Sequence, residues 1–371
     1  MSPRLVDLVQ ARLDEFFTER TPLVTSIAPE LETFLEYSAD LLRGGKRFRA
    51  LFCYWGWQAV GAGRGAFDPL VADETPVDLP SVVTAAAALE LFHAAALVHD
   101  DIMDNSDTRR GAPAAHKRFE QLHRSGRYLG DAEHYGESAA LLLGDLILGW
   151  SDEMLDEGLN TLASRESASA ARLEFNRMRT QVTLGQYLDI LEEKSWQIHP
   201  ETELLPRAHR VIVYKSAKYS VEAPLAIGAR LGGGSAAQVD ALRTFGLPLG
   251  VAYQLRDDLL GVFGDPAVTG KPAGDDLREG KRTVLIALAR TKLPTNVRNL
   301  LDELLGDPDL TQQQIQLLQN AIQESGAIDH VERIIDHNVA LARAALVDAP
   351  LTSGARDQLL QLTETVTQRR A

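Results

Sequence analysis

The chain has 371 residues, 45% of them apolar, and a formal net charge of −14 with a pI near 5.1. This acidic balance argues against a nucleic-acid binder, whose affinity would come from clustered Lys and Arg on phosphates. Cys53 is the single cysteine, so no internal disulfide can form and a reducing compartment is indicated. We interpret Cys53 as a small buried hydrophobe rather than a nucleophile.

Most of the chain is predicted to be helical. Long Ala-, Leu-, Glu- and Arg-rich segments place apolar residues every three or four positions, while strand-like alternation is almost absent. The expected helices cover residues 3–19, 30–43, 48–60, 81–104, 137–157, 168–190, 207–231, 235–263 and 282–291, with several more after 295. We therefore expect an all-α fold.

Three segments are expected to be loops. Segments 61–80 and 124–137 are rich in Gly and charged residues and are expected on the surface, whereas the Lys- and Asp-rich segment 264–281 is expected to cover a charged ligand. None of them demands a domain boundary, so 1–371 is predicted to be one domain. The first residues are too charged for a secretory signal, and no apolar run reaches the roughly 20 residues of a membrane span. We expect a cytoplasmic protein with no integral membrane span.

The predicted helix that ends near residue 104 carries an acidic cluster, in the sequence LVHDDIMD. Asp100 and Asp104 are four residues apart and share a helix face. Carboxylates at the carboxyl end of a helix interact unfavourably with the helix macrodipole unless cations compensate their charge. Magnesium is a suitable cation, because it prefers such oxygen ligands. Arg109 and Arg110 follow, with guanidinium groups suited to phosphate. The pattern favours a metal and phosphate site over a solvated acidic helix end. His93 lies seven residues before Asp100 and shares its helix face. We interpret His93 as a hydrogen-bond donor to a phosphate rather than as a core residue.

A second acidic cluster, Asp257 and Asp258 in YQLRDDLLG, lies on another apolar helix with Gln254 one turn before it. Facing helices would bring the two clusters together across a cavity, where metal ions hold a diphosphate. Basic residues that fit such a cavity occur in GGKRFR, at Lys215 with Ser216, at Lys271, and at Lys281 with Arg282. Solvated surface charge is the alternative for each, above all for the last pair.

Together these motifs resemble the trans-prenyl diphosphate synthases. The motifs that carry the resemblance occur in order over residues 41–283: GGKRFR, H-x6-DDxxD-x4-RRG-x-P, the Gly185-Gln186 pair, the Lys215-Ser216 pair, and QLRDD followed by GD, GK and GKR. The segment PAVTGKPAGDDLREGKRT is especially similar to actinobacterial geranylgeranyl diphosphate synthases. The resemblance implies an isoprenoid-synthase-type bundle of long helices around a deep central cavity. It also implies a homodimer and a reaction that joins isopentenyl diphosphate to an allylic diphosphate.

Carried over residue by residue, the resemblance implies these roles. Isopentenyl diphosphate is bound by Lys46, Arg49, His93 and Arg110, and the allylic diphosphate by Arg109, Lys215 with Ser216, and Lys271. The metal ligands are Asp100, Asp104 and Asp257, with three Mg2+ ions expected when substrate is bound. The catalytic set combines these three with Arg109, Lys215 and Lys271. Supporting residues are Asp101, Gln186, Gln254, Asp258 and Lys281.

One position departs from the family pattern, because the second motif commonly reads DDxxD and here ends at Gly261. Asp265 or Asp275 of the following segment is the expected substitute. A terpene cyclase or head-to-head synthase is an alternative, but GGKRFR and the arginine pair favour a second diphosphate site. A non-catalytic regulatory subunit of another synthase is a further alternative.

Product length is expected to depend on the helix before Asp100. If the growing prenyl tail runs along this helix, Ala95 and Ala96 are too small to block it. Phe92, about 12 Å from Asp100 at 1.5 Å rise per residue, is a candidate floor, with core packing as the alternative. We expect the C20 product geranylgeranyl diphosphate, with farnesyl or longer products as alternatives.

Overall fold

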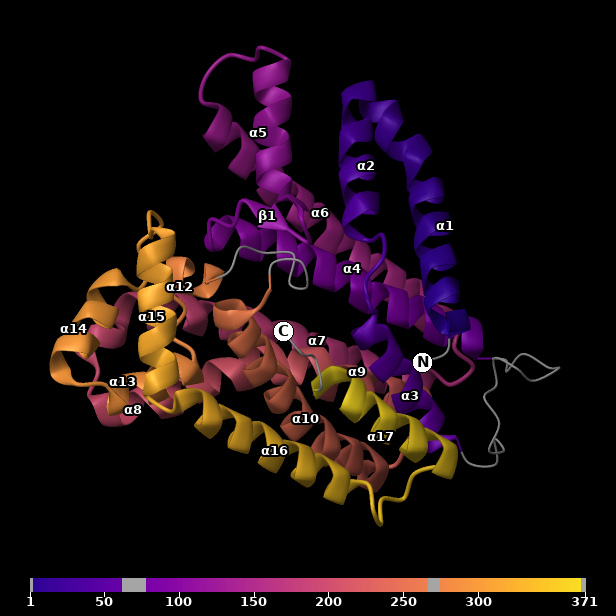
Figure 1. Cartoon of the computed structure of the whole chain (residues 1–371). Helices are drawn as coiled ribbons and strands as arrows, with labels where there is room; N and C mark the ends of the chain where they lie inside the picture. Colours follow the sequence, from indigo (N-terminus) through magenta and orange to yellow (C-terminus); the bar gives the residue numbers. More distant parts are fainter. Residues whose placement is uncertain (1–2, 62–77, 266–273, 368–371) are drawn as a thin grey trace. The chain divides into compact units, whose positions relative to one another are not determined.

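The computed structural model describes residues 3–61, 78–265 and 274–367, and this part of the chain is helical almost throughout (Figure 1). The α-helices are α1 (Pro3–Ile27), α2 (Glu32–Leu41), α3 (Phe48–Val60), α4 (Leu79–Met103), α5 (Ala115–Ser125), α6 (Ala132–Thr161), α7 (Arg165–Ser195), α8 (Glu201–Val211), α9 (Ala223–Leu231), α10 (Ala236–Phe263), α12 (Asp275–Glu279), α13 (Val284–Lys292), α14 (Thr295–Leu304), α15 (Gln312–Glu324), α16 (Ala327–Ala345) and α17 (Ser353–Thr367). The expected all-α fold is confirmed.

Short elements complete this part of the chain. Two 3-10 turns, η1 (Pro29–Leu31) and η2 (Trp196–Ile198), and a π-helix, η3 (Ile212–Glu222), connect the longer helices. Strands β1 (Thr108–Arg109) and β2 (Ala112–Pro113) form an antiparallel pair, in which Arg109 is opposite Ala112.

The described part of the chain forms two compact units. The first comprises Met1–Arg172, Pro224–Ser235 and Thr352–Ala355, and the second comprises Leu173–Ala223, Ala236–Leu351 and Arg356–Ala371. The organisation of residues 1–371 as one domain stays a prediction.

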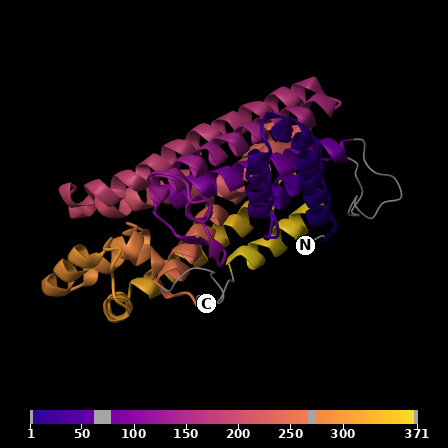
Figure 2. The same cartoon turned by 90° about the horizontal axis from the view of Figure 1, so that it is seen from above.

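The first unit is built around α4, which packs against α1, α3 and α6. Small residues allow this: the stretch Ala85–Ala88 is fully buried, and a Cβ on Gly158 of α6 would lie 2.9 Å from the Ser81 carbonyl oxygen. Ser151 donates a hydrogen bond to the Ala88 carbonyl at 2.9 Å. The indigo helices α1 and α2 lie side by side in the same unit (Figures 1 and 2).

Helix α4 is more apolar than the sequence pattern indicated. It is long and apolar enough to cross a membrane, with a mean hydropathy of 1.7 over an 18-residue window, but 83% of that window is buried inside the molecule. The hydropathy therefore reflects a core helix.

Cys53 of α3 is likewise fully buried, and burial raises the pKa of its thiol to about 12.

The second unit is built around α10, which packs against η3 and α16. Gly250 permits this approach, since a Cβ there would lie 2.6 Å from the Ala217 carbonyl oxygen. The apolar core of the unit includes Leu255, Leu285 and Ile315, each at most 1% exposed.

Several predicted boundaries were wrong. The expected loop 124–137 is short, because α5 ends at Ser125 and Asp131 starts α6 by accepting hydrogen bonds from the backbone of Glu133 and His134. The expected helix 207–231 is divided into α8, η3 and α9, and the expected loop 264–281 contains α12. Most of the expected loop 61–80 lies outside the described residues.

Candidate active site

The first acidic cluster lies at the carboxyl end of α4, as predicted. Asp100 and Asp101 are in the last turn, and Asp104 caps the helix. Asp101 is only 1% exposed and accepts hydrogen bonds from Nε of Arg109, at 2.8 Å, and from its Nη2. The same Nη2 lies 3.3 Å from Oδ2 of Asp100. The β1–β2 turn thus returns Arg109 onto the cluster, where Asp101 fixes its guanidinium group.

The next residue, Arg110, reaches the GGKRFR segment. It has φ +54° and is followed by Gly111 at φ +77°, so the chain reverses sharply here. Its Nη1 lies 3.4 Å from the Leu41 carbonyl oxygen and 3.7 Å from the position of a Cβ on Gly45. Gly45 therefore leaves room for the guanidinium group, and two predicted binding segments meet within the first unit.

His93 lies among the arginines that the sequence grouped with it. Its pKa is lowered well below the usual value by burial and by the positive charges of Arg49, Arg110 and Arg109, against a weaker opposing effect of Asp100. The imidazole is therefore neutral near pH 7. Lys46 is exposed at the edge of the same segment, with its ammonium 5.9 Å from the Phe48 ring centre. This concentration of positive charge suits a diphosphate.

Arg47, in the middle of GGKRFR, has a different environment. It is 5% exposed, with Nη1 3.3 Å from Oε2 of the buried Glu90. It also donates to Gln10 Oε1, at 2.7 Å, and to the Leu42 carbonyl, and the other Glu90 oxygen accepts from the Ala50 N–H at 3.2 Å. These contacts hold Arg47, at φ +50°, in the turn before α3. Sequence reasoning missed Glu90, although an acidic residue inside an apolar helix was a signal.

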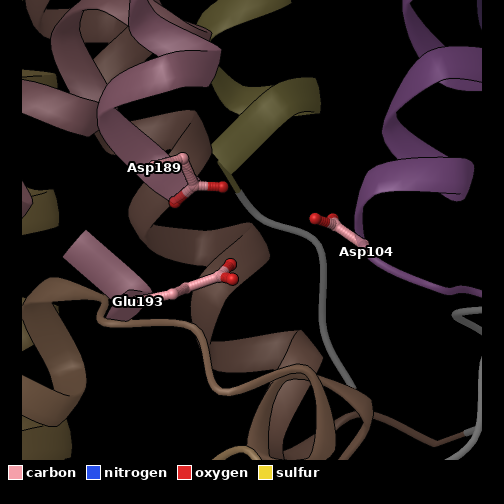
Figure 3. A group of neighbouring side chains, drawn as sticks. All are labelled: Asp104, Asp189 and Glu193. Atoms are coloured by element: carbon pink, nitrogen blue, oxygen red, sulfur yellow. The ribbon is translucent and has the colours of Figure 1, made fainter. Parts of the chain in front are cut away.

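The second unit holds an ion cluster on α7 that the sequence did not reveal. Asp189 Oδ2 lies 2.5 Å from Nζ of Lys215 and 3.2 Å from Nζ of Lys281, which is also 3.0 Å from Glu193 Oε1. Figure 3 shows Asp189 and Glu193 on adjacent turns; Asp104, also labelled, belongs to α4 of the first unit. The spacing of QYLDILEE was the available signal, because residues four apart share a helix face. Lys281 is thus part of an ion cluster rather than a solvated surface charge.

Gly185 explains why Lys215 reaches this cluster. A Cβ on Gly185 would lie 2.5 Å from both the Lys215 nitrogen and the Tyr214 carbonyl carbon. Only glycine therefore allows η3 to lie this close to α7. Lys215 and Ser216 are both half-buried on η3, and Gln186, also half-buried, follows Gly185. π-helical segments are frequent at functional sites.

The second acidic motif lies in the last turns of α10. Asp257 is exposed, whereas Asp258 is 5% exposed and accepts a hydrogen bond from Gln254 Nε2 at 2.8 Å. Burial, together with the negative charges of Asp257 and Asp189, raises the pKa of Asp258 to about 7. Among the described residues, Asp258 Oδ2 has no hydrogen-bond partner. One turn of α10 therefore carries the exposed carboxylate of Asp257 and the buried carboxylate of Asp258.

Gly261, where the family pattern has a third aspartate, lies against another carboxylate. A Cβ on Gly261 would lie 2.1 Å from Oδ2 of Asp276 in α12. The short helix α12 thus directs Asp276, the residue after Asp275, toward α10. The approach of Asp265 or Asp275 to this motif stays a prediction.

The remaining predicted residues are placed as follows. Phe92 and Ala95 are 3% and 1% exposed, and Ala96 is half-buried. Burial of Phe92 fits both a floor and ordinary core packing. Lys271 lies outside the described residues.

Comparison with known proteins gives the class to which these residues belong. The family model for polyprenyl synthetase matches residues 28–323. The chain is 31% identical over 319 residues to the geranylfarnesyl diphosphate synthase of Aeropyrum pernix, covering 86% of this chain and 88% of that one. It is 29% identical over 330 residues to the geranylgeranyl diphosphate synthase of Methanosarcina mazei, covering 88% and 84%.

A solved structure is similar over nearly the whole chain. The geranylgeranyl pyrophosphate synthase of Corynebacterium glutamicum, complexed with isoprenyl diphosphate and magnesium, is 38% identical, with a TM-score of 0.90 and coverage of 99% of both chains. The chain belongs to the polyprenyl synthetase family, and it is a chain-elongating prenyltransferase.

Proposed function

We propose that the protein condenses isopentenyl diphosphate with an allylic diphosphate, in a magnesium-dependent reaction that yields geranylgeranyl diphosphate. The similarity to the Corynebacterium glutamicum enzyme, at 38% identity over 99% of both chains, carries this proposal. The basic residues described above support it, because the first unit presents Arg49, Arg109 and Arg110 around a neutral His93.

The acidic residues fit magnesium. Asp100 and Asp104 offer hard oxygen atoms from one helix face, Asp257 offers an exposed carboxylate, and Asp258 Oδ2 is a buried oxygen with no partner among the described residues. We assign Asp100, Asp104 and Asp257 as the ligands, and expect three ions with substrate. When bound, magnesium neutralises the diphosphate and makes it a better leaving group. Asp101 contributes indirectly, by holding Arg109 in place.

The isopentenyl diphosphate is assigned to Lys46, Arg49, His93 and Arg110. Guanidinium groups bind phosphate oxygens in pairs, and a neutral imidazole can donate one further hydrogen bond without adding charge. Arg47 is excluded from this set, because its guanidinium is committed to Glu90, Gln10 and the Leu42 carbonyl.

The allylic diphosphate is assigned to Arg109, Lys215 and Lys271, with Ser216, Gln186, Gln254, Asp258 and Lys281 in support. The positive charges of Arg109, Lys215 and Lys271 stabilise the diphosphate as it leaves. The allylic carbocation then forms in a site from which water is excluded. Isopentenyl diphosphate then attacks the cation, and the proton that is lost passes to the departing diphosphate. Asp189, which contacts both Lys215 and Lys281, positions these ammonium groups.

The C20 product is supported by the similarity to the geranylgeranyl synthases of Corynebacterium glutamicum and Methanosarcina mazei. Phe92 stays the proposed floor for the growing chain, with Ala95 and Ala96 too small to block it. Farnesyl and longer products are the alternatives, and the relatives include a geranylfarnesyl synthase. We also propose that the protein is a homodimer, as the family resemblance implies, and light scattering on the purified protein tests its mass. The single domain and the cytoplasmic location expected from the sequence pattern stay proposals.

The test incubates purified protein with magnesium, labelled isopentenyl diphosphate and each allylic primer in turn, and identifies the products by mass spectrometry. We expect C20 product, and no product from an Asp100→Asn/Asp104→Asn control. A wild-type protein that elongates none of the primers would contradict the proposal and favour a regulatory subunit.

A further inference from the structure

Arg282, the residue next to Lys281, takes no part in the substrate assignments. Both residues lie in the short segment between α12 and α13. Lys281 reaches the last turns of α7, where its Nζ is 3.2 Å from Oδ2 of Asp189 and 3.0 Å from Oε1 of Glu193. The Arg282 guanidinium lies over the ring of Trp196 in η2, the turn that follows α7, with Cζ 3.9 Å from the ring centre. Two consecutive residues therefore contact the end of α7 and the turn after it.

The Arg282 guanidinium is buried with few hydrogen bonds. Its Nε and Nη1 are buried and have no hydrogen-bond partner among the described residues, and its Nη2 lies 3.4 Å from the Leu305 carbonyl oxygen. Burial lowers the pKa of Arg282 to about 10, against the negative charges of Asp302 and Glu193, so the group is charged near pH 7. Such a buried charge is costly. The contact with the Trp196 ring, whose face attracts a cation, offsets part of this cost.

Trp196 is itself fixed by its neighbours in the second unit. It is 4% exposed and packs in a small apolar cluster with Leu204 of α8 and Ala287 of α13. The guanidinium of Arg290 lies 4.8 Å from the centre of the same ring and is paired with Asp302 of α14, at 2.9 Å from Nη2 to Oδ2. The neighbouring helices therefore set the position of the ring on which Arg282 stacks.

The backbone on the other side of Lys281 is fixed by close packing. Gly280, at φ +79°, lies against the chain that follows α14, since a Cβ there would be 2.8 Å from the Cα of Gly306. The Lys281 N–H donates a hydrogen bond to the Asp276 carbonyl at 3.0 Å. Lys281 thus lies between two anchors, the packed glycine before it and the stacked Arg282 after it.

We propose that Trp196 and Arg282 are positioning residues, whose contact sets the direction of the Lys281 side chain and so places its ammonium group for the allylic diphosphate. This rests on the proposed function, in which Lys281 supports the binding of that diphosphate. Arginine suits the task because its planar guanidinium stacks on an aromatic ring, whereas a lysine ammonium is a point charge on a flexible chain.

The experiment asks whether the ring acts through Lys281. Wild type is compared with Trp196→Leu, which removes the ring, with Trp196→Phe, which keeps one, with Lys281→Met, and with the double variant Trp196→Leu/Lys281→Met. Arg282→Gln, alone and combined with Lys281→Met, repeats the comparison from the other partner. The matched control is Arg290→Gln, which removes the second guanidinium over the same ring. Steady-state kinetics are measured for both substrates, together with the Tm of each protein.

We expect Trp196→Leu and Arg282→Gln each to lower kcat/KM for the allylic primer by about tenfold, which is within the range of a lost cation–π contact. The KM for isopentenyl diphosphate at saturating primer stays at the wild-type value, because the residues assigned to that substrate belong to the first unit. Trp196→Phe and Arg290→Gln stay within about twofold of wild type. In Lys281→Met, removing the ring or Arg282 has no further effect, since the group that they position is already absent.

Losses that are as large in the Lys281→Met background as in wild type overturn the proposal, because they show a role that does not pass through Lys281. Wild-type kcat/KM in both Trp196→Leu and Arg282→Gln also overturns it, as does an equal loss in Arg290→Gln. If Trp196→Leu does not fold, the Arg282→Gln pair decides between these outcomes. Failure of the proposed function is recognised separately, because it appears as a wild-type protein that elongates no primer.

Discussion

Replacing Gly185 by alanine tests whether the close approach of η3 to α7 places Lys215 for its role. The added Cβ would lie 2.5 Å from the Lys215 nitrogen, and an ordinary contact begins near 3.4 Å, so η3 or α7 must move by about 0.9 Å. Lys215 Nζ, now 2.5 Å from Asp189, would move with its backbone. A displacement of roughly 1 Å in a positioning group lowers rate by about 100-fold.

The assay is steady-state kinetics of the Gly185→Ala protein with an allylic primer, together with its Tm. We expect kcat to fall by about 100-fold, because Lys215 is assigned to the departing diphosphate. The matched control is Gly149→Ala: Gly149 is also within a long helix but exposed, and a Cβ there would meet nothing within 4 Å. That change should leave kcat unaltered and raise the free energy of unfolding by roughly 0.5–1 kcal/mol. Wild-type kcat in Gly185→Ala would refute the reasoning.

Three further predictions concern the first unit. Glu90→Ala should lower the free energy of unfolding by about 3–5 kcal/mol, since it leaves the buried Arg47 charge unpaired; an urea midpoint equal to wild type would contradict this. Phe92→Ala should lengthen the product if Phe92 is the floor, and an unchanged product distribution by mass spectrometry would assign Phe92 to core packing alone. Cys53 should resist alkylation at about pH 8 in the folded protein, because its raised pKa keeps the thiol protonated, and should react on unfolding; rapid labelling of folded protein would argue against this burial.

The sequence predicted what local periodicity controls. Helices α3, α4 and α10 begin and end within a few residues of their expected limits, and Asp100 and Asp104 share a helix end as their spacing requires. A continuous apolar pattern and a four-residue repeat are properties of one segment. They can therefore be recognised without knowing which other segments pack against it.

Features that depend on tertiary contacts were not predictable. Asp189 lies 26 residues from Lys215 and 92 from Lys281, and its four-residue spacing from Glu193 indicates a shared helix face but not these lysine partners. Glu90 lies 43 residues from Arg47. The approach of Asp276 to Gly261 depends on a five-residue helix between two left-handed glycines, which the sequence pattern assigned to a loop.

The cluster on α7 has a consequence for ligand entry. Lys215 and Lys281 bring two positive charges, and Asp189 and Glu193 bring two negative ones, so the four side chains together carry no net charge when all are ionised. The two carboxylates therefore offset the repulsion between the two ammonium groups. Under the proposed assignment, a diphosphate that binds these lysines would replace carboxylates already in place, so each ammonium group would exchange one anionic partner for another.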